Sequence, residues 1–368
     1  MPLSCYITPV FKIKSSNFGI FVMREKIVAL VACLIIFTTV LIIGVTTVVR
    51  SNTKSEKPAE QPLEQTVVPP APAEITPPPP VIKPPEKKYR FKRAKRSENR
   101  LPFDFSTAAR LPKHLEQYRY TAGILVDLDN RKVLWQHNSK KPVPIASLTK
   151  LLTIYTAFEE MEKREDITLK TRITVSLECT HADKVKINLK PGEKIPLNEL
   201  FIYAMLRSAN DAAHLIAEFF GNGENDVFIR KMNNYAALAG MTDSQFFNAN
   251  GLPIYGQKPE DTKMNTASCL DMVKLIDRIY DYPKILQYTS LREINTPYGV
   301  IRNGNRLLHN NSAMEGLKTG YTNAAGNCLA FSCRKNGRRL VGVVTGFAKR
   351  QNCFDFTAKL LAWGFQKK

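Results

Sequence analysis

The pattern of apolar and polar positions changes character along the chain. Residues 27–49 form an unbroken apolar run without a charged side chain, and residues 58–85 are rich in proline. From about Leu115 onward, apolar residues recur with the spacings of strands and helices, so only this last region can build a hydrophobic core. The expected organisation is a short cytoplasmic segment over 1–26, a membrane-spanning anchor over 27–49, a disordered Pro-rich and basic linker over 50–114 and a catalytic domain over 115–368.

Segments with strand character lie at both ends of the folded region, and segments with helical spacing lie between them. Asn336-Gly337 separates two β-rich segments and predicts a tight hairpin turn. The predicted strands are 122–128, 133–137, 329–334 and 340–345, and the predicted helices are 147–162, 200–220 with a break near 207–211, 227–238, 268–279 and 355–365. This order predicts an α+β domain, in which helices flank an antiparallel sheet.

The apolar run 27–49 is long enough to cross a bilayer, since it would extend for roughly 34 Å as a helix. Lys12, Lys14, Arg24 and Lys26 precede it, which predicts a cytoplasmic N-terminus and an extracytoplasmic domain. A cleavable signal peptide is the alternative, but a signal peptide has a shorter apolar core and a small-residue cleavage site. We therefore expect a single-pass anchor that stays attached.

Two further segments separate this anchor from the folded region. Pro58–Pro85 holds 11 of the 23 prolines, and such a stretch favours an extended polyproline conformation that acts as a spacer. Lys87–Arg100 carries eight basic residues and contributes to a net charge of +20. It is either a solvated charged run or a segment attracted to an anionic lipid or wall polymer. A nucleic-acid partner is not expected, because the anchor places this charge at a membrane.

The cysteines and histidines do not indicate a metal or cofactor site. Five cysteines follow the anchor, and they read as buried free thiols rather than a disulfide framework, although a Cys328–Cys333 pair stays open. The five histidines lack metal-ligand spacing and read as structural or surface residues. We expect no cofactor and no metal.

Three short motifs occur in one order along the folded region. Ser147-Leu-Thr-Lys150 has the form S-x-x-K, Ser208-Ala-Asn210 has the form S-x-N, and Lys318-Thr319-Gly320 has the form K-T-G. The first two forms each occur three times in the chain and carry little information alone. Their ordered combination is typical of serine acyl-transfer enzymes.

The predicted setting of Ser147 suits a nucleophile. It opens the first long helix, whose unpaired N–H groups and positive end favour a developing oxyanion. Lys150 lies three residues on, and therefore on the same helical face. A serine hydroxyl needs an adjacent base, and a lysine serves if burial and a second cation such as Lys318 lower its pKa.

These motifs and their flanks resemble one known family. The region from about Arg119 to Phe365 is similar to the low-molecular-mass penicillin-binding proteins, the serine D-alanyl-D-alanine carboxypeptidases. The likeness extends to Ile145–Thr153, Leu189–Glu193, Leu206–Ala213, Phe247–Leu252 and Gly316–Thr322. The resemblance implies the penicillin-binding protein and β-lactamase type of transpeptidase fold.

The resemblance also implies roles for individual residues. The enzyme would trim the terminal D-alanine from peptidoglycan stem peptides through an acyl-enzyme on Ser147, and β-lactam antibiotics would bind there covalently. Lys150 would act as the base and Ser208 as a proton relay. Binding of substrate would fall to Asn210, Lys318, Thr319 and Gly320, and the oxyanion hole to the backbone N–H groups of Ser147 and Tyr321. The family often carries a C-terminal β-rich domain and an amphipathic anchoring helix, whose anchoring role we expect the N-terminal span to replace.

Three other functions remain to be weighed. A class A β-lactamase shares the motifs and uses a Glu followed four residues later by Asn for deacylation, but Glu224, Glu260 and Glu293, which lie between the S-x-N and K-T-G motifs, lack that Asn. A DD-endopeptidase, which cuts cross-linked peptides, would use the same residues with another leaving group. A catalytically idle wall-binding protein would rely on the basic segment alone. Labelling by penicillin separates the last from the enzymes.

Overall fold

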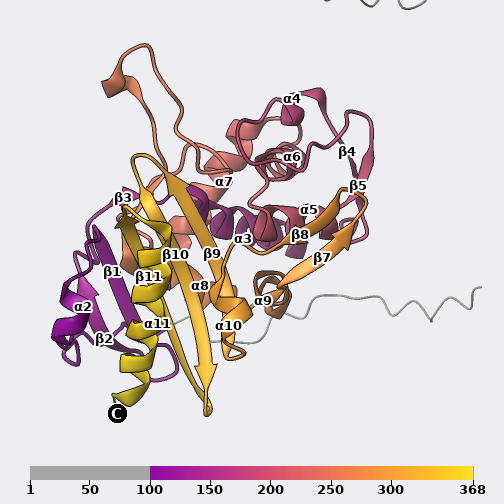
Figure 1. Ribbon diagram of the computed structural model, residues 1–368. Coiled ribbons are helices and arrows are strands. Elements are labelled where there is room, and N and C mark those ends of the chain that lie inside the picture. The colour runs from indigo at the N-terminus through magenta and orange to yellow at the C-terminus, as the bar shows by residue number, and fades with distance from the viewer. Residues whose placement is uncertain (1–99, 368) are drawn as a thin grey trace, which may run out of the picture. The chain divides into compact units, whose positions relative to one another are not determined.

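A five-stranded antiparallel sheet organises residues 100–367, the part of the chain that the computed structural model describes (Figure 1). Its order, β2-β1-β11-β10-β9, places strands from the two ends of this region side by side. The strands are β1 (Ala122–Asp127), β2 (Lys132–His137), β9 (Met314–Thr322), β10 (Gly326–Lys335) and β11 (Arg338–Phe347).

The β10–β11 hairpin that the sequence predicts is present in this sheet, and β1 and β2 form a second hairpin. The β10–β11 turn has φ 51° at Asn336 and 78° at Gly337, which are the positive values that a type I′ turn requires. β1 is buried at every position and pairs with β11 on one side and β2 on the other. Because every residue of β1 is buried, its sequence is almost wholly apolar rather than alternating.

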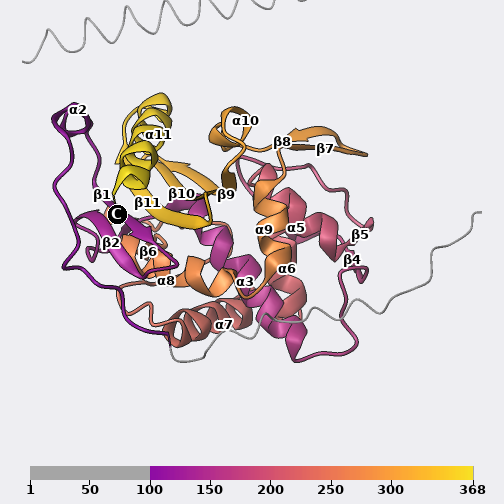
Figure 2. The same cartoon turned by 90° about the horizontal axis from the view of Figure 1, so that it is seen from below.

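One face of the sheet is covered by the closing helix α11 (Arg350–Gln366), which runs along β10 and β11 (Figure 2). Aromatic rings fill the space beneath it, with Phe356 lying 4.9 Å from Tyr120 and 5.6 Å from Trp135 between ring centroids. α11 therefore closes a core of its own, separate from the larger core on the opposite face.

The opposite face packs against α8 and a group of helices that includes α3 (Figures 1 and 2). The helices of this region are α2 (Lys113–Glu116), α3 (Thr149–Glu162), α4 (Leu177–Thr180), α5 (Leu197–Leu206), α6 (Asn210–Phe220), α7 (Asn225–Leu238), α8 (Cys269–Ile279), α9 (Pro283–Ser290) and α10 (Leu307–Asn310), with 3₁₀ turns η1 (Ala146–Leu148) and η2 (Pro259–Asp261). Three two-stranded sheets complete it: β3 (Val143–Pro144) with β6 (Thr266–Ala267), β4 (Arg172–Thr174) with β5 (Lys194–Pro196), and β7 (Glu293–Thr296) with β8 (Gly299–Arg302). The predicted α+β class is thus confirmed.

The packed region begins earlier than the boundary at residue 115 that the sequence suggested. Arg100 pairs with Asp277 at 2.8 Å and with Asp281 at 2.6 Å, both near the end of α8. Leu111 is buried. The Asp104 backbone N–H donates to the Arg131 carbonyl oxygen, and the Asp104 carbonyl oxygen accepts from the Val133 N–H. Residues 100–114 therefore belong to the fold rather than to the linker, because buried ion pairs and backbone hydrogen bonds hold them on it.

The expected anchor over 27–49 and most of the linker lie outside the described residues. Between residues 100 and 367 there is no helix with the length and apolar character needed to cross a membrane. The five cysteines of this region, Cys328 and Cys333 included, are buried free thiols.

Candidate active site

Ser147 lies in the 3₁₀ turn η1, immediately before α3 begins at Thr149. The sequence placed it inside the first turn of the α-helix, and the structure corrects this. Ala146 has φ 47°, a left-handed conformation that is uncommon for alanine. Two glycines allow this turn to sit close to its neighbours: a Cβ on Gly251 would lie 2.1 Å from the Ala146 carbonyl oxygen, and one on Gly320 would lie 3.1 Å from the Ser147 nitrogen.

Lys150 is completely buried, and its amine faces the nucleophile. Its Nζ lies 3.1 Å from Ser147 Oγ, 2.8 Å from Asn210 Oδ1 and 2.6 Å from the Asn250 carbonyl oxygen. The two carbonyl-type oxygens can only accept hydrogen bonds. A neutral amine would satisfy them with its two N–H groups and keep its lone pair for the Ser147 hydroxyl.

The surroundings favour that neutral amine. Burial lowers the pKa of Lys150 well below 10.5, and the positive charge of Lys318 lowers it further, while the Asp211 carboxylate opposes them. A lysine whose pKa is lowered in this way can act as a general base. The geometry and the electrostatics of Lys150 therefore point to the same chemistry.

The S-x-N segment lies between α5 and α6. Ser208 has φ 64°, and Asn210 begins α6 with its side chain bridging two groups. Asn210 Oδ1 accepts from Lys150, and Asn210 Nδ2 donates to the Asp183 carbonyl oxygen at 2.8 Å. Within residues 100–367 the Ser208 hydroxyl forms no hydrogen bond with Lys150 or Lys318, so its proposed relay role has no preformed contact.

Lys318, Thr319 and Gly320 lie in β9, the edge strand that passes beside η1. Lys318 is only 2% exposed, and its Nζ donates to the Thr319 carbonyl oxygen at 3.0 Å. Burial and the neighbouring Arg350 lower the pKa of Lys318 to about 7. The next residue after the motif, Tyr321, keeps its side chain exposed.

Arg350 is a further candidate residue that the sequence did not single out. It begins α11, and its Nη2 donates to the Gly304 carbonyl oxygen at 2.7 Å. A Cβ on Gly304 would lie 3.0 Å from Thr319 Oγ1 and 3.4 Å from Arg350 Nη2. Thr319 Oγ1 and Arg350 Nη2 thus lie beside the same glycine, and Arg350 is near enough to Lys318 to lower its pKa. A hydroxyl and two basic side chains grouped in this way suit a carboxylate. A lone arginine at a helix start has no sequence pattern that would have found it.

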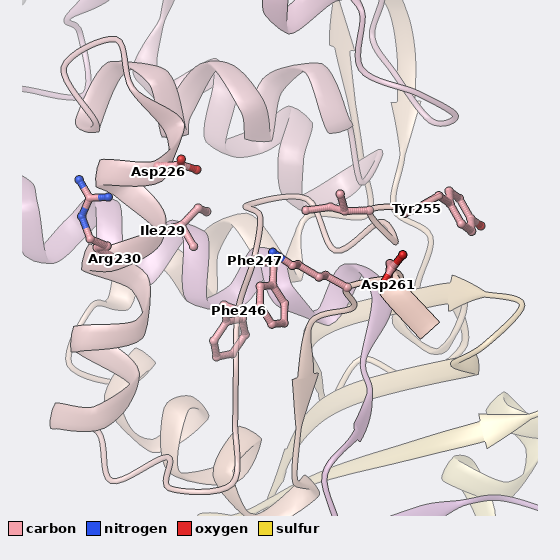
Figure 3. A pocket seen from close by; sticks show the side chains of 10 residues that line it. Asp226, Ile229, Arg230, Phe246, Phe247, Tyr255 and Asp261 are labelled. Atoms are coloured by element: carbon pink, nitrogen blue, oxygen red, sulfur yellow. The ribbon is translucent and has the colours of Figure 1, made fainter. Parts of the chain in front are cut away.

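The segment 246–251 forms another wall of the site. Asn265 fixes this wall, since its Oδ1 accepts from Phe247 N at 2.7 Å and its Nδ2 donates to Thr149 Oγ1 at 3.1 Å. A cavity of about 470 Å³ opens beside it, between α7 and the loop that carries Tyr255 (Figure 3). Phe246 and Phe247 line that cavity, whereas the catalytic motifs do not. The wall therefore separates this cavity from the motif residues.

Comparison with known proteins identifies the family. A sequence profile described as D-alanyl-D-alanine carboxypeptidase matches residues 108–349. The chain belongs to this family. The carboxypeptidase DacC of Escherichia coli is 32% identical over 255 residues, and DacF of Bacillus subtilis is 29% identical over 251 residues. The matches cover 67% of this chain but only 61% and 62% of those relatives.

Solved structures of the family share the fold of the described region. Penicillin-binding protein D2 of Listeria monocytogenes, in its ampicillin-bound form, has 27% identity and a TM-score of 0.59 over 67% of this chain and 97% of its own. A D-alanyl-D-alanine carboxypeptidase of Mycobacterium tuberculosis has 26% identity and a TM-score of 0.62 over 72% of this chain and 96% of its own. The predicted penicillin-binding protein fold is confirmed.

Proposed function

We propose that this protein is a serine D-alanyl-D-alanine carboxypeptidase that acts on peptidoglycan stem peptides through an acyl-enzyme on Ser147. The contact that carries the proposal is the 3.1 Å approach of the buried Lys150 amine to Ser147 Oγ. The family and the carboxypeptidase names of the relatives support the substrate class.

The proposed reaction begins with proton transfer. Lys150 Nζ takes the Ser147 hydroxyl proton while Oγ attacks the carbonyl carbon between the two terminal D-alanines. Backbone N–H groups of Ser147 and Tyr321 would stabilise the resulting oxyanion, and the loss of one such donor typically costs about 10²–10³ in rate. The C–N bond then breaks, the proton returns from Lys150 through Ser208 to the departing amine, and D-alanine leaves.

The second half of the reaction removes the acyl group. Lys150, neutral again, takes a proton from water, whose oxygen attacks the ester carbonyl carbon. The bond from that carbon to Ser147 Oγ then breaks, and Lys150 returns the proton to Oγ. Lys318, Thr319 and Arg350 would hold the terminal carboxylate, and Asn210 would bond the peptide amide. Gly320, without a side chain, lets the peptide lie along β9. The same geometry predicts that β-lactams acylate Ser147, and the ampicillin-bound form of penicillin-binding protein D2, a protein of similar fold, supports β-lactam binding.

Two relatives favour a second candidate, a DD-endopeptidase. The D-alanyl-D-alanine endopeptidases of E. coli and Pseudomonas aeruginosa are each 27% identical, and the matches cover 76% of their length. The acyl-enzyme chemistry would be unchanged, and only the leaving group would differ. Digestion of a monomeric pentapeptide and of a cross-linked dimer decides between them: free D-alanine from the monomer supports the carboxypeptidase, and cleaved dimer alone supports the endopeptidase.

The proposal also places the catalytic domain outside the cytoplasm on an anchor formed by residues 27–49. The unbroken apolar run and the preceding basic residues support it. Fractionation of the full chain together with a variant carrying two aspartates in the run, Ile35→Asp with Leu41→Asp, tests it. We expect membrane association for the unchanged chain and its loss in the variant; equal distribution of both would contradict the anchor.

A further inference from the structure

The carboxylate of Asp211 is completely buried directly beside the catalytic cluster, although no role was assigned to it from the sequence. It accepts hydrogen bonds from three successive backbone N–H groups: Ile187 at 3.1 Å, Asn188 at 2.9 Å and Leu189 at 3.2 Å. Asn188 has φ 65°, so the backbone turns its N–H groups toward one centre. Such a concave arrangement binds an anion, and here the anion belongs to the protein.

These bonds fasten a loop to the S-x-N segment. The Asn210 backbone N–H donates to the Val185 carbonyl oxygen at 2.8 Å, and Asn210 Nδ2 donates to the backbone carbonyl oxygen of Asp183 at 2.8 Å. The loop 183–189 is thus held by two consecutive residues, Asn210 and Asp211. The same Asn210 side chain accepts from Lys150 at 2.8 Å, so the loop is connected to the base through one asparagine.

We propose that Asp211 is a positioning residue that acts on Lys150 in two ways. Its hydrogen bonds to residues 187–189 hold Asn210 against the lysine, and its negative charge offsets part of the positive charge gathered around the site. This inference rests on the proposed acyl-transfer function of Ser147 and adds to it a device that sets the basicity of Lys150.

The charges around the site explain why such an offset matters. Lys150 faces Lys318 on β9, and Lys318 faces Arg350 on α11, so the site brings three basic side chains together. Asp211 favours the protonated form of Lys150 and thereby keeps the pKa of this lysine from falling further. Asp211 itself also faces Cys179 on α4 and Tyr298 in the β7–β8 turn.

The first test is Asp211→Asn in the full chain, with the rate of acylation by a fluorescent penicillin measured against pH. The asparagine amide has nearly the same volume as the carboxylate, but it carries no charge. Its NH₂ group would also face the backbone N–H groups of residues 187–189, which need an acceptor. We expect acylation to slow about 10- to 100-fold, because Asn210 loses its support. We also expect the acidic limb of the profile to move down by on the order of half a pH unit or more, because Lys150 stays neutral to a lower pH.

The matched control is Asp271→Asn. Asp271 is also completely buried near a helix start, where it accepts from Asp243 N at 2.7 Å and pairs with Lys274 at 2.8 Å. Within residues 100–367 its side-chain oxygens bond Asp243, Ser244 and Lys274, none of which belongs to the proposed site. We expect Asp271→Asn to lower the melting temperature about as much as Asp211→Asn does, but to leave the acidic limb of the pH profile in place. An acidic limb that moves equally in both variants overturns the inference.

A second variant, Asn188→Val, opens the loop without removing the charge. A β-branched residue is strained at φ 65°, so the N–H groups should turn away while Asp211 stays. Slower acylation with an unmoved acidic limb is expected, and acylation at the wild-type rate overturns the positioning role. If Asp211→Asn does not fold, this variant still tests the positioning role. If wild type is not labelled at Ser147, the proposed function is refuted. If wild type is labelled but the acidic limb of the pH profile does not move in Asp211→Asn, only the role of Asp211 is refuted.

Discussion

Replacing Lys318 with methionine should make the fold more stable and the enzyme much slower. Lys318 is 2% exposed and lies near two other basic residues, Lys150 and Arg350. Burial of an ammonium group in such a place is unfavourable, and the site keeps it because a carboxylate is to bind there. Methionine has a similar length and no charge, so it removes the unfavourable group without leaving a large cavity.

The magnitude follows from the shift in the pKa of Lys318 from 10.5 to about 7. One pKa unit corresponds to about 1.4 kcal/mol, so the folded protein disfavours the protonated form by about 5 kcal/mol relative to the unfolded chain. Loss of the hydrogen bond to the Thr319 carbonyl oxygen offsets about 1 kcal/mol. Allowing for relaxation around the new side chain, we expect Lys318→Met to raise the free energy of unfolding by about 2–4 kcal/mol at pH 6.

The sign of the pH dependence is fixed by linkage. The folded pKa of Lys318 is lower than the unfolded one, so between about pH 7 and pH 10.5 the unfolded chain binds more protons. The destabilisation of wild type is therefore complete below about pH 7 and fades as the pH rises toward 10.5. The advantage of Lys318→Met should shrink over that interval.

Urea unfolding of both proteins at pH 6 and at pH 10, followed by tryptophan fluorescence, measures this difference. Lys335→Met is the matched control, because Lys335 is exposed at the end of β10 in the same sheet. It should change the free energy of unfolding by less than about 0.5 kcal/mol. Equal or lower stability of Lys318→Met at pH 6, or a gain that does not depend on pH, would refute the reasoning.

Two other substitutions test the geometry around the motifs. Gly251→Ala should slow acylation about 100-fold or more, because the new Cβ would lie 2.1 Å from the Ala146 carbonyl oxygen and displace the turn that carries Ser147. Gly337 also has a positive φ, but a Cβ there would have no atom within 4 Å, so Gly337→Ala should lose only about 1 kcal/mol of stability and keep its acylation rate. Similar kinetics for the two alanine variants would contradict this reading. Arg350→Gln should raise KM for a peptide with a free terminal carboxylate by about 10-fold or more, and should raise the pKa of Lys318 because a neighbouring cation is gone; a KM unchanged for that peptide would remove Arg350 from the carboxylate site.

The sequence was sufficient for those parts of the site that depend on local spacing or on motif order. A separation of three residues was enough to bring Ser147 and Lys150 together, because a 3₁₀ turn followed by a helix preserves that proximity. The Asn336-Gly337 turn was likewise readable, since few residue pairs accept two positive φ values. The order of the motifs was also sufficient to indicate the family.

Other features depend on packing between distant segments and could not be predicted from the sequence. The left-handed conformation of Ala146 is possible only because Gly251 and Gly320 leave room for it. The Asn250 contact to Lys150 is made by a backbone carbonyl, which every residue type possesses. Arg350 reaches the site from the start of the closing helix. In each case the residue type alone carries no indication of its neighbour.

The most direct measurement of the central claim is the mass of penicillin-treated protein before and after proteolysis, for wild type and for Ser147→Ala. The account predicts one penicillin adduct on wild type, located in the peptide that contains Ser147, together with D-alanine release from a pentapeptide. It predicts neither signal for Ser147→Ala, with an unchanged circular dichroism spectrum. An adduct on another residue, or D-alanine release that persists in folded Ser147→Ala, would contradict it.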